Sequence, residues 1–286
     1  MEHLIFDLTG SYDADVMKRF LGEGADRIDL QDAPGTNLYC DDAARERLSK
    51  LITARDPYGI RFLDSGNTHY LSALLAEQVA EDFCLVLFDH HTDCKAAMFD
   101  MLSCGSWVRT VQKENPHCRQ TLLIGPPKSA FRELEEFLGE RGETLPEGTV
   151  CITEEDLLAK GAEAVAEAAA QIRYPIYLSV DKDILSADTV RTNWDQGQIS
   201  FPLLLQCLQA LSCGFPAETG KGAVEQEAER VMPEKAPDLT SGGAARHRLL
   251  ALDICGLLPV REGAGFYEEE GCETDRKIAE LFLHGI

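Results

Sequence analysis

The stretch CLVLFDHHTD at residues 84–93 decides the fold class, because an unbroken apolar run passes directly into acidic and imidazole side chains. The continuous apolar run Cys84–Phe88 predicts a β-strand that is buried on both faces, as in a parallel sheet. Similar runs alternate with helical patterns along the chain, and this alternation predicts βαβ units and an α/β fold. The other predicted strands are 4–8, 60–63, 121–124, 150–152, 176–180 and 249–254, and the predicted helices are 70–80, 155–172, 201–211 and 275–283.

The length of 286 residues and the hydrophobic content of 44% are sufficient for one large core. We therefore expect a single α/β domain over residues 1–286. The segment at about 214–247 differs from the rest, since it is rich in Gly, Pro, Glu and Lys and poor in apolar side chains. It is expected to be a polar loop or a partly helical excursion, acting either as a plain connector or as a functional lid.

The charge balance excludes several classes of partner. The chain has 49 acidic and 27 basic residues, a formal charge of −22. Such a surface repels nucleic-acid phosphates and anionic lipid head groups, so a nucleic-acid or membrane-surface protein is not expected. Small neutral or cationic ligands and metal ions remain compatible, as does self-association into a homo-oligomer.

The N-terminal residues and the cysteines indicate the compartment. The chain begins MEHLIFD, without the basic and long apolar regions of a secretory signal. No stretch approaches the roughly 20 apolar residues of a membrane span. None of the ten cysteines forms a C-x-x-C pair, which argues against zinc-ribbon and thioredoxin-type sites. We expect a cytoplasmic protein with free thiols.

The first candidate metal-binding segment follows the apolar run. Asp89, His91 and Asp93 are spaced two residues apart, so an extended chain would point all three side chains the same way. Two carboxylates and an imidazole at one point are ligands for a divalent ion. The alternative is an acidic loop with one capping aspartate.

Two further strand ends carry similar residues. Asp181 and Asp183 follow the predicted strand 176–180, and buried neighbouring carboxylates repel unless a cation neutralises them. The alternatives are solvated loop aspartates or an ion pair with Lys182. His69 follows the Gly66-Asn67-Thr68 turn after a third strand and is of interest because of that position.

These side chains would meet at one edge of a parallel sheet, at the carboxyl ends of the strands. One divalent ion would leave the carboxylates unbalanced, whereas two would bring the cluster close to neutrality. Oxygen donors with some imidazole and no thiolate favour Mn²⁺ over structural zinc. A metal pair could bridge a water, lower its pKa and polarise an electrophile.

In this order, Gly66–His69, Asp89–Asp93 and Ser179–Asp183 resemble the motifs of the ureohydrolase superfamily, which includes arginase, agmatinase and formimidoylglutamase. The resemblance covers most of the chain. It implies a three-layer α/β/α fold with a mostly parallel eight-stranded sheet, and a binuclear manganese site. By position, one ion would be held by His69, Asp89, Asp93 and Asp181, and the other by Asp89, His91, Asp181 and Asp183. Asp89 and Asp181 would bridge the ions.

Two departures from the family pattern bear on function. Cys104 stands where the family usually has a proton-shuttling histidine, and Gly256 stands where it has a glutamate that binds a guanidinium or amine. Cys104 is either a proton carrier or a packing residue. Because a guanidinium requires a carboxylate fork, Gly256 argues against a standard arginase or agmatinase activity.

The segment Asn193-Trp194-Asp195 could compensate for the missing glutamate. Asp195 could offer a carboxylate, and Trp194 a face for a cation or planar group. The alternative is a turn with Trp194 packed at the rim. We assign Asn193, Trp194 and Asp195 to substrate binding, and Asp93, Asp195 and Cys104 to catalysis.

The resulting prediction is a binuclear manganese hydrolase of a C–N bond in a small guanidine-, amidine- or amide-type substrate. A metal-bridging hydroxide would be the nucleophile. The first alternative is a metal-binding, non-catalytic relative that acts as a ligand-binding or assembly protein. The second is another reaction on the same metals, such as amide deacetylation.

Overall fold

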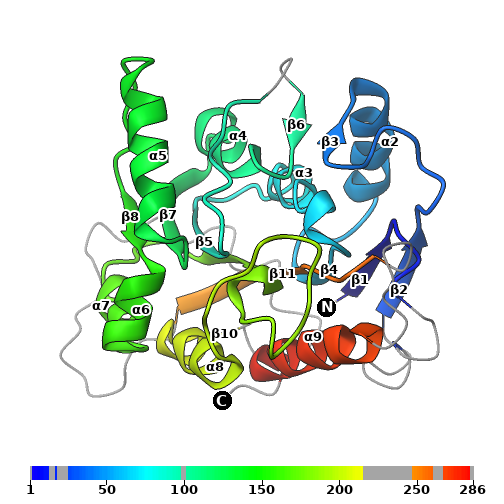
Figure 1. The fold of residues 1–286 in the computed structure, drawn as a ribbon. Coiled ribbons are helices and arrows are strands. Elements are labelled where there is room, and N and C mark those ends of the chain that lie inside the picture. The colour runs from blue at the N-terminus through cyan, green and yellow to red at the C-terminus, as the bar shows by residue number, and fades with distance from the viewer. Residues whose placement is uncertain are drawn as a thin grey trace, which may run out of the picture.

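The centre of the molecule is an eight-stranded, all-parallel sheet (Figure 1). The computed structural model describes residues 2–12, 17, 25–97, 101–214, 247–259 and 267–283, so residues 215–246 of the predicted polar excursion lie outside it. The strand order is β2-β1-β4-β11-β9-β5-β7-β8. The strands span β1 Glu2–Asp7, β2 Ala25–Asp29, β4 Gly59–Phe62, β5 Phe83–Phe88, β7 Cys118–Ile124, β8 Thr149–Ile152, β9 Ile176–Asp181 and β11 His247–Cys255. The predicted α/β class and eight-stranded parallel sheet are confirmed.

Three short strands complete the described β-structure. β10 (Cys213–Gly214) extends the sheet beside β11, while β3 (Tyr39–Cys40) and β6 (Leu102–Ser103) pair antiparallel outside it. Of these eleven strands, four were not predicted, namely β2, β3, β6 and β10. β2 has the sequence ADRID, which lacks an apolar run because the strand lies at the edge of the sheet.

The helices lie in two layers, one on each face of the sheet (Figure 1). Their bounds are α2 Asp42–Thr53, α3 Leu71–Ala76, α4 Trp107–Glu114, α5 Lys128–Gly139, α6 Glu154–Lys160, α7 Glu163–Ala169, α8 Phe201–Ala210 and α9 Tyr267–Leu283. The predicted helix 155–172 is two helices, because Gly161 adopts a φ of 63° and ends α6. Thr153 caps α6 through a reciprocal pair of hydrogen bonds with Asp156.

Alternate residues of β5 face opposite sides of the sheet, and each side packs against its own layer of helices. Val86 contributes to the core that includes residues of α6, α7, α8 and α9. Leu85 and Leu87 contribute to the core on the opposite face, which includes residues of α2, α3, α4 and α5. Both faces of the strand therefore remove apolar surface from water, which is the main favourable contribution to folding.

The strand register brings four strand ends to one edge of the sheet. Phe88 at the end of β5 pairs with Val180 of β9, and Cys255 at the end of β11 pairs with Asp181 of β9. Ile254 pairs in turn with Phe62 at the end of β4. The segments that leave these strands must therefore start side by side. In the described part of the chain, no helix is long and apolar enough to cross a membrane.

Candidate metal centre

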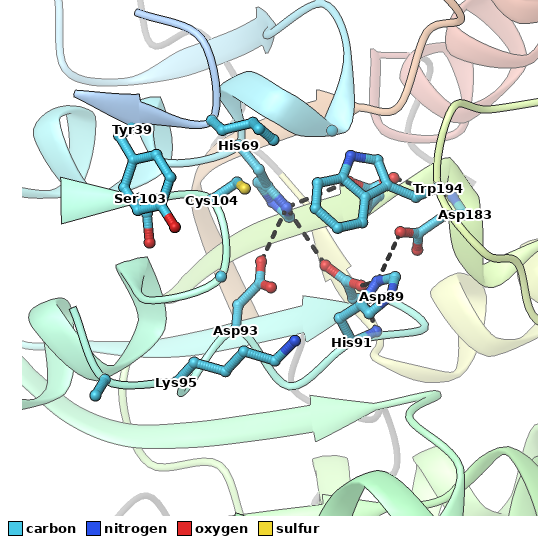
Figure 2. Close-up of a pocket in the computed structure, with 15 residues that line it drawn as sticks. Tyr39, His69, Asp89, His91, Asp93, Lys95, Ser103, Cys104, Asp183 and Trp194 are labelled. Carbon is cyan, nitrogen blue, oxygen red and sulfur yellow. Dashed lines mark hydrogen bonds and ion pairs between the residues drawn. The ribbon is translucent and has the colours of Figure 1, made fainter. Parts of the chain in front are cut away.

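The six predicted ligands come together at this edge of the sheet (Figure 2). Asp89 follows β5, Asp181 ends β9, and His69 follows the short 3-10 turn Gly66–Thr68 after β4. Asp89, Asp93, Asp181, Asp183 and His69 are buried. His91 is partly buried, and all six residues line one pocket.

His69 is at the centre of the first group of donors. Its Nδ1 lies 3.3 Å from a carboxylate oxygen of each of Asp89, Asp93 and Asp181. Its Nε2 lies 2.8 Å from Ser179 Oγ. A proton on Nε2 that is donated to Ser179 leaves the Nδ1 lone pair directed at the three carboxylates, as a metal-binding histidine requires.

His91 is at the centre of the second group. Its Nδ1 lies 2.9 Å from Asp183 Oδ2 and 3.4 Å from Asp89 Oδ1. The Asp89 carboxylate therefore divides between the two groups, since Oδ2 faces His69 and Oδ1 faces His91. This is the arrangement expected of a carboxylate that bridges two ions.

The aspartates converge through turns, and the extended chain that the sequence analysis assumed is wrong here. β5 ends at Phe88, and the backbone N–H of His91 donates to Asp89 Oδ1 over 2.6 Å. Asp183 N likewise donates to Asp181 Oδ1 over 3.0 Å, within a 3-10 turn. Aspartate side chains readily bond the backbone two residues on, and this curls each segment around the site.

Asp93 is held in a left-handed backbone conformation, with a φ of 48°. Trp107 Nε1 donates to Asp93 Oδ2 over 2.6 Å, and Val108 N donates to the Asp93 carbonyl over 3.1 Å. Trp107 is fully buried at the start of α4. It positions Asp93, and this role was not predicted from the sequence.

The pKa values of Asp93, Asp183 and His91 are raised because the cluster holds more negative than positive charge. Burial, then Asp181 and Asp89, raise the pKa of Asp183 well above its ordinary value. Burial and Asp89 raise the pKa of Asp93 to about 6. Burial opposes the charging of His91, but Asp183 and Asp89 raise its pKa to about 12. Without another cation, the cluster must retain protons.

The residues present fit divalent metal ions. Donors bound about 2.1 Å from one ion lie about 3.0 Å apart at right angles and about 3.4 Å apart at tetrahedral angles. The contacts of His69 and His91 span this range. Among the residues that the structure describes, three groups of donors lie close enough to hold an ion, namely His69/Asp89/Asp93, Asp89/His91/Asp183 and His69/Asp181/Cys255. The bridging role of Asp181 stays a prediction.

Gly256 has a conformational reason to be glycine. Its φ is 93°, and an added Cβ would lie 2.4 Å from Asp181 Oδ1 and 2.9 Å from Lys182 N. A glutamate could not occupy this position without displacing Asp181. The departure from the family pattern is therefore part of how this chain holds its acidic cluster. Lys182, for which a pair with the neighbouring aspartates was an alternative, instead forms a buried ion pair with Asp275 of α9.

The three residues assigned to substrate binding occupy different places. Trp194 lines the pocket, with its ring 5.5 Å from the His91 ring and its Nε1 donating to Asn67 Oδ1 over 2.9 Å. Asn193 Nδ2 donates to the same Asn67 oxygen over 3.0 Å, and Asn193 is not among the lining residues. The Asp195 side chain is 78% exposed and contacts His91 Nε2 over 3.1 Å, also outside the lining. This contact with His91 Nε2 is suited to orienting the His91 ring.

Cys104 lines the pocket and is buried. Burial and then Asp93 raise the pKa of its thiol to about 12, which disfavours the thiolate at neutral pH. Its role as a proton carrier stays a prediction. Lys95, which the sequence analysis did not consider, lines the same pocket two residues beyond Asp93. Its position two residues after Asp93 is the feature of the sequence that could have indicated Lys95.

Comparisons with solved structures support the fold described above. Arginase from Bacillus subtilis superposes with a TM-score of 0.60 at 13% identity, over 100% of this chain and 99% of that one. The chain has the fold of the ureohydrolases. For a formiminoglutamase of Trypanosoma cruzi with Mn²⁺ the TM-score is 0.58 at 12% identity, covering 98% and 92% of the chains. For proclavaminate amidino hydrolase of Streptomyces clavuligerus it is 0.59 at 15% identity, covering 98% and 91%.

For this protein with the ureohydrolase fold, comparison of sequences identifies fewer similarities than comparison of structures. No protein-family model matches it. An uncharacterized protein of Thermotoga maritima is 29% identical over 151 residues, which are 53% of this chain and 52% of the relative. The match thus spans about half of the relative's length. The fold is therefore established by structure, and the identities of 12–15% show a divergent member of that fold.

Proposed function

We propose that this protein is a binuclear metal-dependent hydrolase of a C–N bond in a small guanidine-, amidine- or amide-type substrate, with manganese as the metal. The observation that carries the proposal is the Asp89 carboxylate, whose two oxygens face His69 and His91 separately. A carboxylate shared in this way is suited to two adjacent ions, and a two-metal site is suited to hydrolysis.

The proposed ligands of one ion are His69, Asp89, Asp93 and Asp181, and those of the other are Asp89, His91, Asp181 and Asp183. Oxygen donors with imidazole favour manganese among the common divalent ions. Two such ions supply Lewis acidity and activate water at neutral pH. The T. cruzi formiminoglutamase, which has the same fold, contains Mn²⁺.

The chain's own residues shape the rest of the site. Ser179 orients the His69 ring, Trp107 holds Asp93, and Asp195 contacts the far nitrogen of His91. Hydrogen bonds of this kind fix the orientation of ligands and raise their basicity. Trp194 lines the pocket beside His91, and the pocket volume of about 220 Å³ suits a small substrate.

A hydrolysis assay tests the proposal. Manganese-loaded protein is incubated with guanidine, amidine and amide substrates, and released urea, ammonia or amine is measured. Manganese-dependent release from one class, lost in Asp183→Ala, supports the proposal. A protein that binds two equivalents of Mn²⁺ and releases nothing from any class would instead be the non-catalytic ligand-binding relative.

A further inference from the structure

One group of donors at the metal centre contains a thiol. His69, Asp181 and Cys255 each offer one atom, and these three atoms lie within 4.8 Å of one another. All three side chains are buried. His69 and Asp181 are proposed ligands of one ion, whereas Cys255 has no part in the proposed ligand sets. Among the cysteines that the structure describes, Cys255 alone belongs to such a group, and Cys104, which lines the pocket, does not.

The sheet itself places this thiol beside a proposed ligand. Cys255 is the last residue of β11 and pairs in register with Asp181 at the end of β9. Side chains at paired positions of adjacent parallel strands point to the same face of the sheet. That face packs against α3, which begins at Leu71, two residues after His69. The thiol, the carboxylate and the imidazole therefore meet because of the strand register and the position of α3.

The Cys255 thiol is close enough to join an ion with only a small movement. Its Sγ now donates to the Ser65 carbonyl over 3.1 Å. A nitrogen or oxygen donor about 2.1 Å from an ion and a sulfur donor about 2.3 Å from it lie about 3.6 Å apart at a tetrahedral angle. From within 4.8 Å, the sulfur would have to approach by at most about 1.2 Å. Cys255 does not line the pocket, so this contact would take no space from a substrate.

Sulfur would make the two ion positions chemically different. The proposed ligands at His91 are carboxylates and imidazole, while the position at His69 would add a thiolate. Thiolate ligands favour zinc over manganese, which prefers oxygen donors. We propose that the Cys255 thiolate is a further ligand of the ion at His69, and that this position selects zinc over manganese when both ions are offered.

This inference rests on the proposed function, which supplies the other ligands of the same ion. When the ion binds, the S–H bond breaks, its proton passes to water, and a bond between sulfur and the metal forms. Manganese offered alone still fills both positions, since the carboxylates and imidazoles remain. The alternative for Cys255 is a buried thiol that only packs against its neighbours.

Cobalt(II) is the probe that separates these two roles. A thiolate bound to Co²⁺ gives a sulfur-to-metal charge-transfer band in the near ultraviolet, which oxygen and nitrogen ligands do not give. Titration of the metal-free full chain with Co²⁺ should produce this band. Cys255→Ser and Cys255→Ala should lack the band and still bind two cobalt ions through the remaining ligands.

Two control variants assign the band to one sulfur and one ion. Cys104→Ser should keep the band, because Cys104 lines the pocket and belongs to no donor group. Asp183→Ala should weaken the ion at His91 and also keep the band, because Asp183 is not a proposed ligand of the ion at His69. Loss of the band in Cys104→Ser, or its retention in both Cys255 variants, overturns the inference.

Competition between ions tests the selectivity. Dialysis of the wild type against equal concentrations of Zn²⁺ and Mn²⁺ should leave one zinc equivalent bound. In Cys255→Ser the preference for zinc should fall by about tenfold, which corresponds to about 1.4 kcal/mol. An unchanged preference overturns the inference.

Turnover is scored separately from these readouts. Two bound cobalt ions without the band overturn this inference and leave the proposed function intact. A band that depends on Cys255, in a protein that hydrolyses none of the substrates, overturns the proposed function alone. A chain that binds no metal overturns both.

Discussion

Gly256 leaves free the space that Asp181 occupies, since a Cβ at this position would lie 2.4 Å from Asp181 Oδ1. Gly256→Ala should therefore displace a proposed ligand and strain a backbone with a φ of 93°. We expect a loss of about 1–3 kcal/mol in the free energy of unfolding and the loss of at least one manganese equivalent. Urea denaturation and metal analysis measure the two effects.

Gly139→Ala is the control for that variant, because a Cβ there meets nothing within 4 Å. It should leave metal content unchanged. If Gly256→Ala also kept both equivalents, Asp181 could not be a required ligand.

Trp107→Phe should weaken manganese binding by about tenfold, because it removes the N–H that holds Asp93 Oδ2. Titration of the metal-free protein with Mn²⁺ gives the dissociation constants. Trp194→Phe removes an indole N–H that bonds Asn67 and no proposed ligand, so its metal affinity should match that of the wild type. Equal effects of the two variants would mean that the Trp107 bond does not tune the site.

Lys182→Met should cost about 3–5 kcal/mol in the free energy of unfolding, because it leaves Asp275 charged and buried without its partner. The double variant Lys182→Met/Asp275→Leu should recover much of that loss, since two apolar groups avoid the cost of burying charge. Lys50→Met, which breaks an exposed pair with Glu46, should change little. A double variant as unstable as Lys182→Met would show that the ion pair is not the cause.

The metal-free protein should lose stability as the pH rises. Burial opposes protonation of His91, yet Asp183 and Asp89 raise its pKa from 6.5 to about 12. A raised histidine pKa stabilises the fold fully below pH 6.5, and this contribution falls as the pH rises toward the folded value. Burial and Asp89 raise the pKa of Asp93 from 3.8 to about 6, so its contribution likewise falls between those values.

Manganese binding should reverse this trend, because the ions replace the protons that the cluster retains. Affinity should increase with pH, and binding should release protons. Calorimetry in buffers of different ionisation enthalpy counts them. A proton release near zero at pH 7 would contradict the protonated state of His91 in the metal-free site.

The apolar runs predicted the central strands of the sheet well, because strands such as β5 and β9 are buried on both faces. Edge strand β2, with the sequence ADRID, has no such signal. Helices α2, α4 and α5 were not predicted. Each buries only three spaced apolar residues among many polar ones, and this pattern is less conspicuous than the continuous apolar runs of the strands. The division of 155–172 at Gly161 depends on one backbone angle.

The six proposed ligands could be found from the sequence because parallel strands end at one edge of the sheet. The residues that contact these ligands or line the pocket beside them could not be predicted in this way. Trp107 reaches Asp93 from α4, Ser179 reaches His69 from β9, and Lys95 enters the pocket over Gly105. These contacts depend on side-chain direction after turns, and the turn at Asp93 has a φ of 48°. Sequence spacing alone carries no such information.

The central claim is that His69, His91 and the four aspartates hold two divalent ions. Equilibrium dialysis of the metal-free full chain against Mn²⁺, read by elemental analysis, tests it most directly. We expect two equivalents for the wild type and a loss of metal in Asp89→Asn, because this change removes the carboxylate that faces both histidines. Fewer than one equivalent in the wild type, or two equivalents retained in Asp89→Asn, would contradict it.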